Sequence, residues 1–212
     1  MGAIVLDLPA KGVLTANDEH DPLPFYYKPG VGWLYRYRLT MALDYLRPGG
    51  RVLEIGVGSG VLVPTLTRHF DEYVGTDLVL AKGLDHLVRP GCKASFIIAD
   101  LLDEQSLQAN HFDAIVCISV LEHILDSDAA ARALARALKP GGTCVAGYPM
   151  VSHARSRAFD VIGFKGIDDH HVSAPAKIEA SLRKVLKPKG RTAFPPLSPV
   201  PLALYQASAW TK

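Results

Sequence analysis

The segment that decides the fold is Val52-Leu53-Glu54-Ile55-Gly56-Val57-Gly58-Ser59-Gly60. An apolar run enters a turn with glycine at every second position, which predicts a buried strand, a tight turn and then a helix. Glycine lets the backbone approach a ligand where a Cβ atom would collide with it. The N-terminus of the following helix offers free N–H groups that suit a carboxylate or a phosphate. The segment therefore predicts a ligand site beyond the end of this strand.

The sequence around this segment alternates between expected strands and expected helices. We expect strands at residues 51–55, 72–76, 94–99, 112–119, 143–148, 191–194 and 203–210. We expect helices at residues 33–46, 60–70, 78–88, 104–108, 126–138 and 175–185. Pro64 should bend the second helix, Asp126, Ser127 and Asp128 are available to cap the fifth, and Ser173 could cap the last. Strands that are apolar throughout need cover on both faces. The pattern predicts an α/β fold with a doubly wound, mostly parallel seven-stranded sheet and helices on both faces.

The length of 212 residues suits one α/β domain with a full hydrophobic core. Residues 1–31 lack steady periodicity and are rich in proline and aromatic residues, so we expect an irregular N-terminal arm or substrate lid there. Residues 32–212 should form the single domain. Nothing in the sequence predicts an oligomeric state.

The charge balance argues against nucleic acid and membrane partners. The chain has 23 basic and 21 acidic residues, a formal net charge of +2, which gives little long-range attraction to either polyanion. No apolar run approaches the roughly 20 residues of a membrane span, and the opening residues lack a basic signal-peptide region. Three cysteines without C-x-x-C spacing indicate a reducing compartment. We expect a cytoplasmic protein.

Two ligand classes fit a glycine-rich turn between a strand and a helix. A dinucleotide site favours G-x-G-x-x-G or a terminal alanine, whereas Val61 stands at that last position. The pattern Glu54-x-Gly56-x-Gly58-x-Gly60 instead resembles the first motif of the class I S-adenosylmethionine (SAM)-dependent methyltransferases. Asp77, 17 residues after Gly60, would suit the ribose hydroxyls in either class and does not separate them.

Three later segments resemble the same family in the expected order. Residues 96–101 resemble the adenine site, residues 112–123 the fourth-strand motif of the small-molecule enzymes, and residues 136–142 the turn into the fifth strand. Together with the first motif they span residues 51–148. Residues 32–212 are therefore identified as a Rossmann-like SAM-dependent methyltransferase domain.

The resemblance implies SAM as cofactor and direct displacement of its methyl group, with no metal required. The enzyme would mainly supply alignment and, where needed, a base. The resemblance also implies which residues bind the cofactor: Glu54, Gly56, Gly58, Gly60, Asp77, Leu78, Asp100, Leu101 and Ser119.

Candidate residues for the reaction itself are few. His123 follows the fourth strand, near the expected methyl position, and could be the base or a locally packed histidine. His170 and His171 could line the active site or belong to a polar loop. Tyr26 and Tyr27 could close over the substrate or pack against the body. We predict the three histidines as catalytic candidates and the two tyrosines as substrate-binding.

The acceptor is predicted to be a small molecule. Ile118-Ser119-Val120-Leu121 stands where enzymes that methylate exocyclic or amide nitrogens carry Asp/Asn-Pro-Pro-Tyr/Phe, and no nucleic-acid-binding appendage is visible. Two alternatives stay open. A SAM-binding protein without catalysis would carry the same motifs, and an NAD-dependent oxidoreductase would share Asp77.

Overall fold

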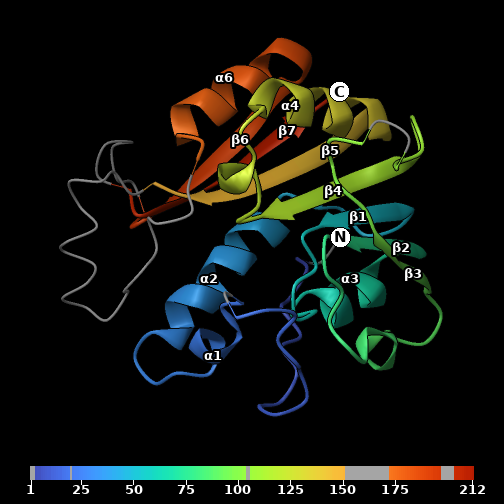
Figure 1. Ribbon diagram of the computed structural model, residues 1–212, viewed down its shortest axis with the longest axis vertical. Coiled ribbons are helices and arrows are strands. Elements are labelled where there is room, and N and C mark those ends of the chain that lie inside the picture. Colours follow the sequence, from blue (N-terminus) through green and yellow to red (C-terminus); the bar gives the residue numbers. More distant parts are fainter. Residues whose placement is uncertain (1–2, 20, 104–105, 151–171, 197–202) are drawn as a thin grey trace.

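The computed structural model describes residues 3–19, 21–103, 106–150, 172–196 and 203–212. One sheet runs through the molecule in the strand order β3-β2-β1-β4-β5-β7-β6 (Figure 1). The strands are β1 (Arg51–Ile55), β2 (Glu72–Asp77), β3 (Lys93–Ile98), β4 (Phe112–Ile118), β5 (Leu138–Pro149), β6 (Lys187–Phe194) and β7 (Tyr205–Thr211). The expected α/β fold with a seven-stranded sheet is confirmed.

The direction of the strands corrects the expectation of a mostly parallel sheet. The pairs β1–β2, β1–β4, β2–β3 and β4–β5 are parallel, but β7 lies antiparallel between β5 and β6, so the sheet is mixed. The physical reason is the short link between the last two strands. Parallel neighbours need a crossover of about a dozen residues or more, and only residues 195–204 separate β6 from β7.

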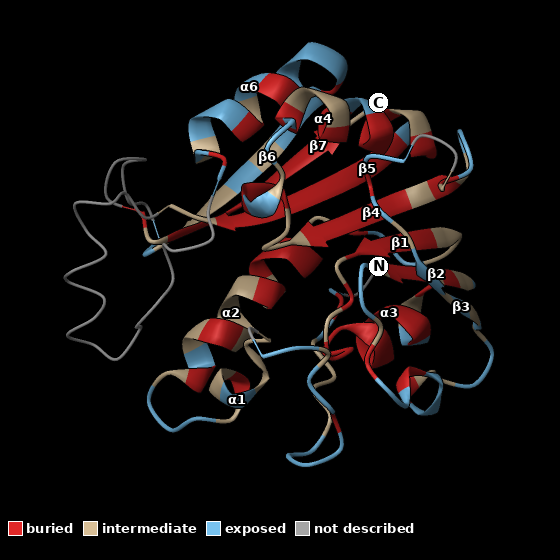
Figure 2. Cartoon of the chain, in the orientation of Figure 1, coloured by how far each residue is buried: buried red, intermediate tan, exposed pale blue. Residues whose placement is uncertain are grey.

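Two clusters of buried apolar residues lie on opposite faces of the sheet. Neighbouring residues of a strand point to opposite faces, and β4 shows this alternation directly. Ala114 and Val116 belong to one cluster, whereas Ile115 and Cys117 belong to the other. Figure 2 shows the central strands buried along most of their length.

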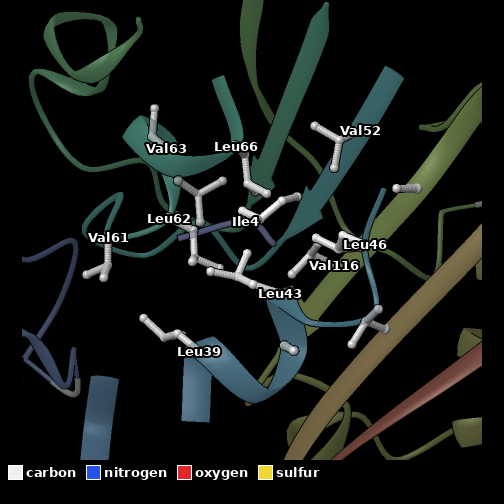
Figure 3. Packing of buried hydrophobic residues seen from close by; sticks show 14 of the residues in the cluster. Ile4, Leu39, Leu43, Leu46, Val52, Val61, Leu62, Val63, Leu66 and Val116 are labelled. Carbon is white, nitrogen blue, oxygen red and sulfur yellow. The ribbon is translucent and has the colours of Figure 1, made fainter. Parts of the chain in front are cut away.

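The described helices divide between these clusters. Helices α2 (Gly32–Leu43) and α3 (Val63–His69) supply the first, and Figure 3 shows Leu43 of α2 and Leu66 of α3 near Val52 of β1. Helices α4 (Ser127–Ala137) and α6 (Pro175–Val185) supply the second. Across the described ranges, no helix combines the length and apolar character that a membrane span requires.

Several helix boundaries differ from the sequence prediction. Instead of a helix over residues 78–88 there is only a short 3-10 turn, η1 (Leu84–Leu87), which follows Gly83 in a left-handed conformation. Pro64 does not bend α3, because it lies in the first turn, where its missing N–H has no helical partner. The expected helix at 104–108 falls partly outside the described residues.

One of the two expected helix caps is confirmed and the other is wrong. Asp126 caps α4 as predicted, since its carboxylate accepts a hydrogen bond from the Ala129 N–H at 2.9 Å. Ala174 rather than Ser173 is the N-cap of α6, because the Ser173 hydroxyl donates to the Ile124 carbonyl at 2.6 Å.

The N-terminal arm packs against the α3 side of the molecule. Ile4 is buried in the first cluster, and the Asp7 carboxylate accepts hydrogen bonds from Arg68 and Arg89. One short helix, α1 (Leu23–Tyr26), lies within the described residues of the arm. The boundary after residue 31 stays a prediction.

Replacing Ile115 by alanine should destabilise the protein by about 2–5 kcal/mol, because its side chain is fully buried in β4 and its removal leaves a cavity. Ile98→Ala in β3 is the matched control, since that side chain is 69% exposed and its loss should change stability by no more than about 0.5 kcal/mol. Urea denaturation measures both. Equal losses for the two variants would contradict this description of the core.

Candidate functional site

The carboxyl ends of β1, β2 and β4 open into a cavity of about 870 Å³. From β1 the strand order proceeds to β2 and β3 on one side of the sheet, and the chain then crosses back to β4 on the other side of β1. Such a switch point leaves a crevice beyond the strand ends, where open α/β sheets bind their ligands. The cavity is therefore the default ligand site of this fold.

The glycine turn after β1 forms one wall of the cavity. Gly56 and Gly58 both have positive φ angles, +77° and +53°. A Cβ atom on Gly56 would collide with the Val120 side chain, so only glycine fits there. The Gly58 N–H donates to Asp77 Oδ2 at 2.8 Å, which fixes the turn against the end of β2. The main chain of the turn thus faces the cavity directly.

Gly60 has a different place. It does not line the cavity, and a Cβ atom there would lie 2.6 Å from Leu84 and 2.8 Å from Leu87 of η1. This glycine allows close packing behind the turn. Its expected contact with a cofactor stays a prediction.

Glu54 lies at the floor of the cavity. It is only 4% exposed, and its Oε2 atom accepts a hydrogen bond from the Tyr73 hydroxyl at 2.6 Å. Burial raises the pKa of this carboxyl to about 8, although the Tyr73 hydrogen bond acts in the opposite direction.

The acids predicted at the ends of β2 and β3 face the same cavity. Asp77 Oδ1 accepts from the Leu78 N–H at 2.7 Å, and Asp100 Oδ1 accepts from the Leu102 N–H at 2.9 Å. These main-chain bonds orient both carboxylates. Leu78 and Leu101 line the cavity beside them.

The end of β4 is strained and points polar groups into the cavity. Ser119 has a φ of +56°, which is uncommon for a residue other than glycine and occurs preferentially at functional sites. Its hydroxyl lies 3.2 Å from the Tyr205 hydroxyl. The 3-10 turn η2 (Leu121–His123) follows and brings Glu122 and His123 to the cavity wall.

Arg38 of α2 lies in the cavity wall among three tyrosines. Its guanidinium carbon is 4.4 Å from the ring centre of Tyr35, 5.4 Å from that of Tyr26 and 5.9 Å from that of Tyr205. It also donates to the Tyr26 hydroxyl at 2.8 Å. Cation–π contacts and this hydrogen bond therefore join α1, α2 and β7 around the cavity. Tyr27, in contrast, does not line the cavity, and its hydroxyl donates to the Pro9 carbonyl.

The N-terminal arm contacts two sides of the cavity. Asp21 accepts hydrogen bonds from the Leu23 N–H at 2.8 Å and from the Ser59 hydroxyl at 3.2 Å, and burial raises the pKa of its carboxyl. The Asn17 side chain donates to the Val79 carbonyl at 3.1 Å, beyond the end of β2. The arm therefore brings an acid to the glycine turn.

The lining of the cavity is strongly acidic. Seven of the lining residues are acids: Asp18, Glu19, Asp21, Glu54, Asp77, Asp100 and Glu122. Among the lining residues that the structure describes, Arg38 is the only arginine or lysine. An excess of carboxylates in a partly desolvated cavity favours a cationic ligand and disfavours an anionic one.

The structure brings most of the predicted site residues together. Those that line the cavity are Tyr26, Glu54, Gly56, Gly58, Asp77, Leu78, Asp100, Leu101, Ser119 and His123. Gly60 and Tyr27 lie outside it, and His170 and His171 lie outside the described residues.

The polar cavity residues that the sequence analysis missed include Asp21, Arg38, Glu122 and Tyr205. Only Arg38 had a usable signal, because it follows buried Tyr35 by three residues and precedes buried Met41 by three, which places a charge on an apolar helix face.

The comparisons with known proteins fit this geometry. A family model described as a methyltransferase domain matches residues 34–190, more than half of the chain. The chain belongs to this methyltransferase-domain family. The matched region of the methyltransferase domain includes Arg38, the glycine turn, Asp77, Asp100 and the whole of η2.

The similarity to curated relatives extends over part of this chain. The chain is 34% identical over 109 residues to a ubiquinone biosynthesis O-methyltransferase of Xanthomonas axonopodis pv. citri, covering 50% of this chain and 46% of that one. It is 28% identical over 150 residues to the protein of the same name from Escherichia fergusonii, covering 62% of each. The chain thus spans about half to three fifths of the length of these relatives.

Two solved structures share the fold of the methyltransferase domain. The N-methyltransferase NodS of Bradyrhizobium japonicum, in complex with S-adenosyl-L-homocysteine (SAH), superposes with a TM-score of 0.66 at 19% identity, covering 93% of this chain and 94% of that one. Phosphoethanolamine N-methyltransferase 2 of Haemonchus contortus, in complex with SAM, gives 0.62 at 16% identity, covering 84% and 52%.

The raised pKa of Glu54 predicts a pH dependence of stability. The folded state keeps a proton on Glu54 up to about pH 8, whereas the unfolded chain releases it near 4.5, so the free energy of unfolding should fall as pH rises between these values. In Glu54→Gln, the free energy of unfolding should decrease less steeply with pH, by up to about 1.4 kcal/mol per pH unit. Urea titrations at pH 5–8 measure it.

Tyr73→Phe is the matched control for this measurement. It removes the hydrogen bond that favours the charged carboxyl while it keeps Glu54, so the fall with pH should persist. A Glu54→Gln protein with the same pH dependence as the wild type would show that Glu54 titrates normally.

Proposed function

We propose that the protein is a SAM-dependent methyltransferase that acts on a small-molecule acceptor. The observation that carries this proposal is the acid-rich cavity at the switch point of a chain from the methyltransferase-domain family. SAM has a sulfonium, an ammonium and a carboxylate, and its net charge is positive. NAD carries a doubly negative pyrophosphate, which the excess of acids over the single arginine of this cavity disfavours. The charge of the cavity therefore favours SAM.

The nucleoside end of SAM would lie against β2 and β3. Asp77 would accept hydrogen bonds from the ribose hydroxyls, because its carboxylate is already oriented by the N–H groups of Gly58 and Leu78. Asp100 would accept from the adenine amine, with Leu101 beside the ring. Two solved structures that share the fold contain SAH and SAM, which supports a SAM site in this cavity.

The methionyl end of SAM would lie between the glycine turn and the arm. It carries an ammonium group, and the cavity offers a complement to it. Asp21 stands at Ser59 as a partly buried carboxylate, suited to the ammonium. The arm over residues 1–31 would then cover the cofactor, with Tyr26 near the acceptor.

SAM supplies an activated methyl group when it is bound. The residues of the chain would hold the acceptor in line with that group and exclude water, which can account for much of the rate of a displacement reaction. His123 in η2 is exposed and lines the cavity, so it remains a candidate for the proton acceptor. The curated relatives named O-methyltransferases support an oxygen nucleophile.

SAH should bind the wild-type protein in calorimetry, and NAD should not. Asp77→Ala should weaken SAH binding by roughly 1.5–3 kcal/mol, because it removes an ionised acceptor from two hydroxyls. Asp71→Ala is the matched control, since that carboxylate also accepts a main-chain N–H, from Gly50, but does not line the cavity. Binding of NAD without binding of SAH would overturn the assignment.

Asp21→Asn should weaken SAH about tenfold or more and leave the binding of 5′-methylthioadenosine unchanged. The first ligand has an ammonium group to pair with Asp21, whereas the second lacks the amino-acid part altogether. Competition binding with both ligands measures the difference. An equal loss for the two ligands would mean that Asp21 acts on the nucleoside end or only holds the arm in place.

A further inference from the structure

Glu122 is the most anomalous polar residue of the cavity. The residue is only 2% exposed. Within the described part of the chain, however, neither of its carboxylate oxygens has a hydrogen-bond partner. Buried polar atoms without partners are rare and need an explanation. The fold does not explain the carboxylate, because the structural contacts of this residue come from its main chain. The Glu122 carbonyl accepts from the N–H groups of Val172 at 2.9 Å and Ser173 at 3.0 Å.

The surroundings of Glu122 show what could fill its unused bonds. It lines the cavity together with Arg38 from α2 and Tyr205 from β7, and both groups interact with it electrostatically. The thiol of Cys117 in β4 faces it from the protein interior, and burial keeps the pKa of that thiol well above its ordinary value. The Arg38 Nε atom is likewise buried without a partner. Within the described residues, one wall of the cavity therefore lacks a donor for the Glu122 carboxylate and an acceptor for the Arg38 Nε atom.

We propose that Glu122 binds the hydroxyl group of the methyl acceptor and takes its proton, and that the acceptor is a phenol. The proposal rests on the proposed function. A hydroxyl both donates and accepts, so it satisfies Glu122 and Arg38 together. The aromatic ring is supported by the side chains of Phe25, Tyr26 and Tyr205, which line the same cavity.

The proton and electron balance of this step is simple. The acceptor O–H bond breaks, its proton moves to a Glu122 oxygen, and its electron pair remains on the acceptor oxygen. That oxygen forms the new bond to the methyl carbon as the carbon–sulfur bond breaks and its electron pair returns to sulfur. Glu122 afterwards releases the proton to solvent.

The protonation of Glu122 supports its role as a base. Burial raises the pKa of Glu122 to about 8, while the nearby main-chain N–H of the same residue and the charge of Arg38 act in the opposite direction. That N–H does not have the geometry of a hydrogen bond to either carboxylate oxygen. A phenolic hydroxyl has an ordinary pKa of about 10. The two values are close enough for efficient proton transfer. Because only the carboxylate accepts a proton, the methylation rate should rise with pH through about 8 and lose this rise in Glu122→Gln.

The test compares two probes whose ring oxygens carry hydrogen or methyl, catechol and 1,2-dimethoxybenzene, on the full chain saturated with SAH; Glu122→Gln and the wild type are compared with both probes, so that the size difference is common to the two proteins. The wild type should bind catechol at least about tenfold more tightly, and Glu122→Gln should reduce this preference to less than about threefold. Asp128→Asn makes the same acid-to-amide change outside the cavity, where Asp128 pairs with Lys184, and should keep the preference.

The folded state of the variants is measured alongside, by SAH binding and thermal unfolding. Glu122→Met is the second variant, and it should fold because no side-chain hydrogen bond of Glu122 is lost within the described fold. An unchanged preference for catechol in a folded Gln or Met variant overturns the proposal. So does loss of the preference in His123→Ala with retention in Glu122→Gln, because His123 would then be the group that binds the hydroxyl.

The outcomes also separate this proposal from the proposed function. A wild-type protein that binds SAH but shows no preference for catechol overturns the inference about Glu122 alone. A wild-type protein that does not bind SAH overturns the proposed function and this inference with it.

Discussion

The site depends on the hydrogen bond between the Gly58 N–H and the Asp77 carboxylate, 2.8 Å long, which joins the ends of β1 and β2. It forms only because the turn adopts positive φ angles and because Gly56 has no Cβ atom to strike Val120. The same turn exposes main-chain atoms to the cavity, and Asp21 reaches it from the arm through Ser59. The cavity wall formed by the glycine turn, the orientation of Asp77 and the position of the arm therefore all depend on the conformation of this one turn.

The cavity gathers carboxyl groups that the fold alone would not favour. Glu54 and Glu122 are both almost completely buried, and burial raises the pKa of each to about 8. A buried carboxyl costs stability when it is charged, so such groups are expected where a ligand uses them. Glu54 has Tyr73 as a partner, whereas the Glu122 side chain has none in the described fold. On the basis of this difference, we assign a supporting role to Glu54 and a ligand-binding role to Glu122.

Much of the fold could be predicted from the sequence because its central strands are apolar runs with clear ends, as in residues 51–55 and 112–118. The position of β7 between β5 and β6 could not, because it depends on long-range pairing with β5. Site residues next to strand ends, such as Asp77, were predictable from the resemblance to the methyltransferase motifs. Asp21 and Tyr205 were not, because they reach the cavity only through tertiary packing of segments with no motif of their own.

A crystal structure of the protein grown with SAH tests the central claim most directly. The account predicts that the ligand occupies the cavity beyond β1, β2 and β4, with its ribose hydroxyls within hydrogen-bonding distance of the Asp77 carboxylate and its amino-acid end beside Asp21 and the glycine turn. Density for SAH anywhere else, or a ribose that does not contact Asp77, would contradict it.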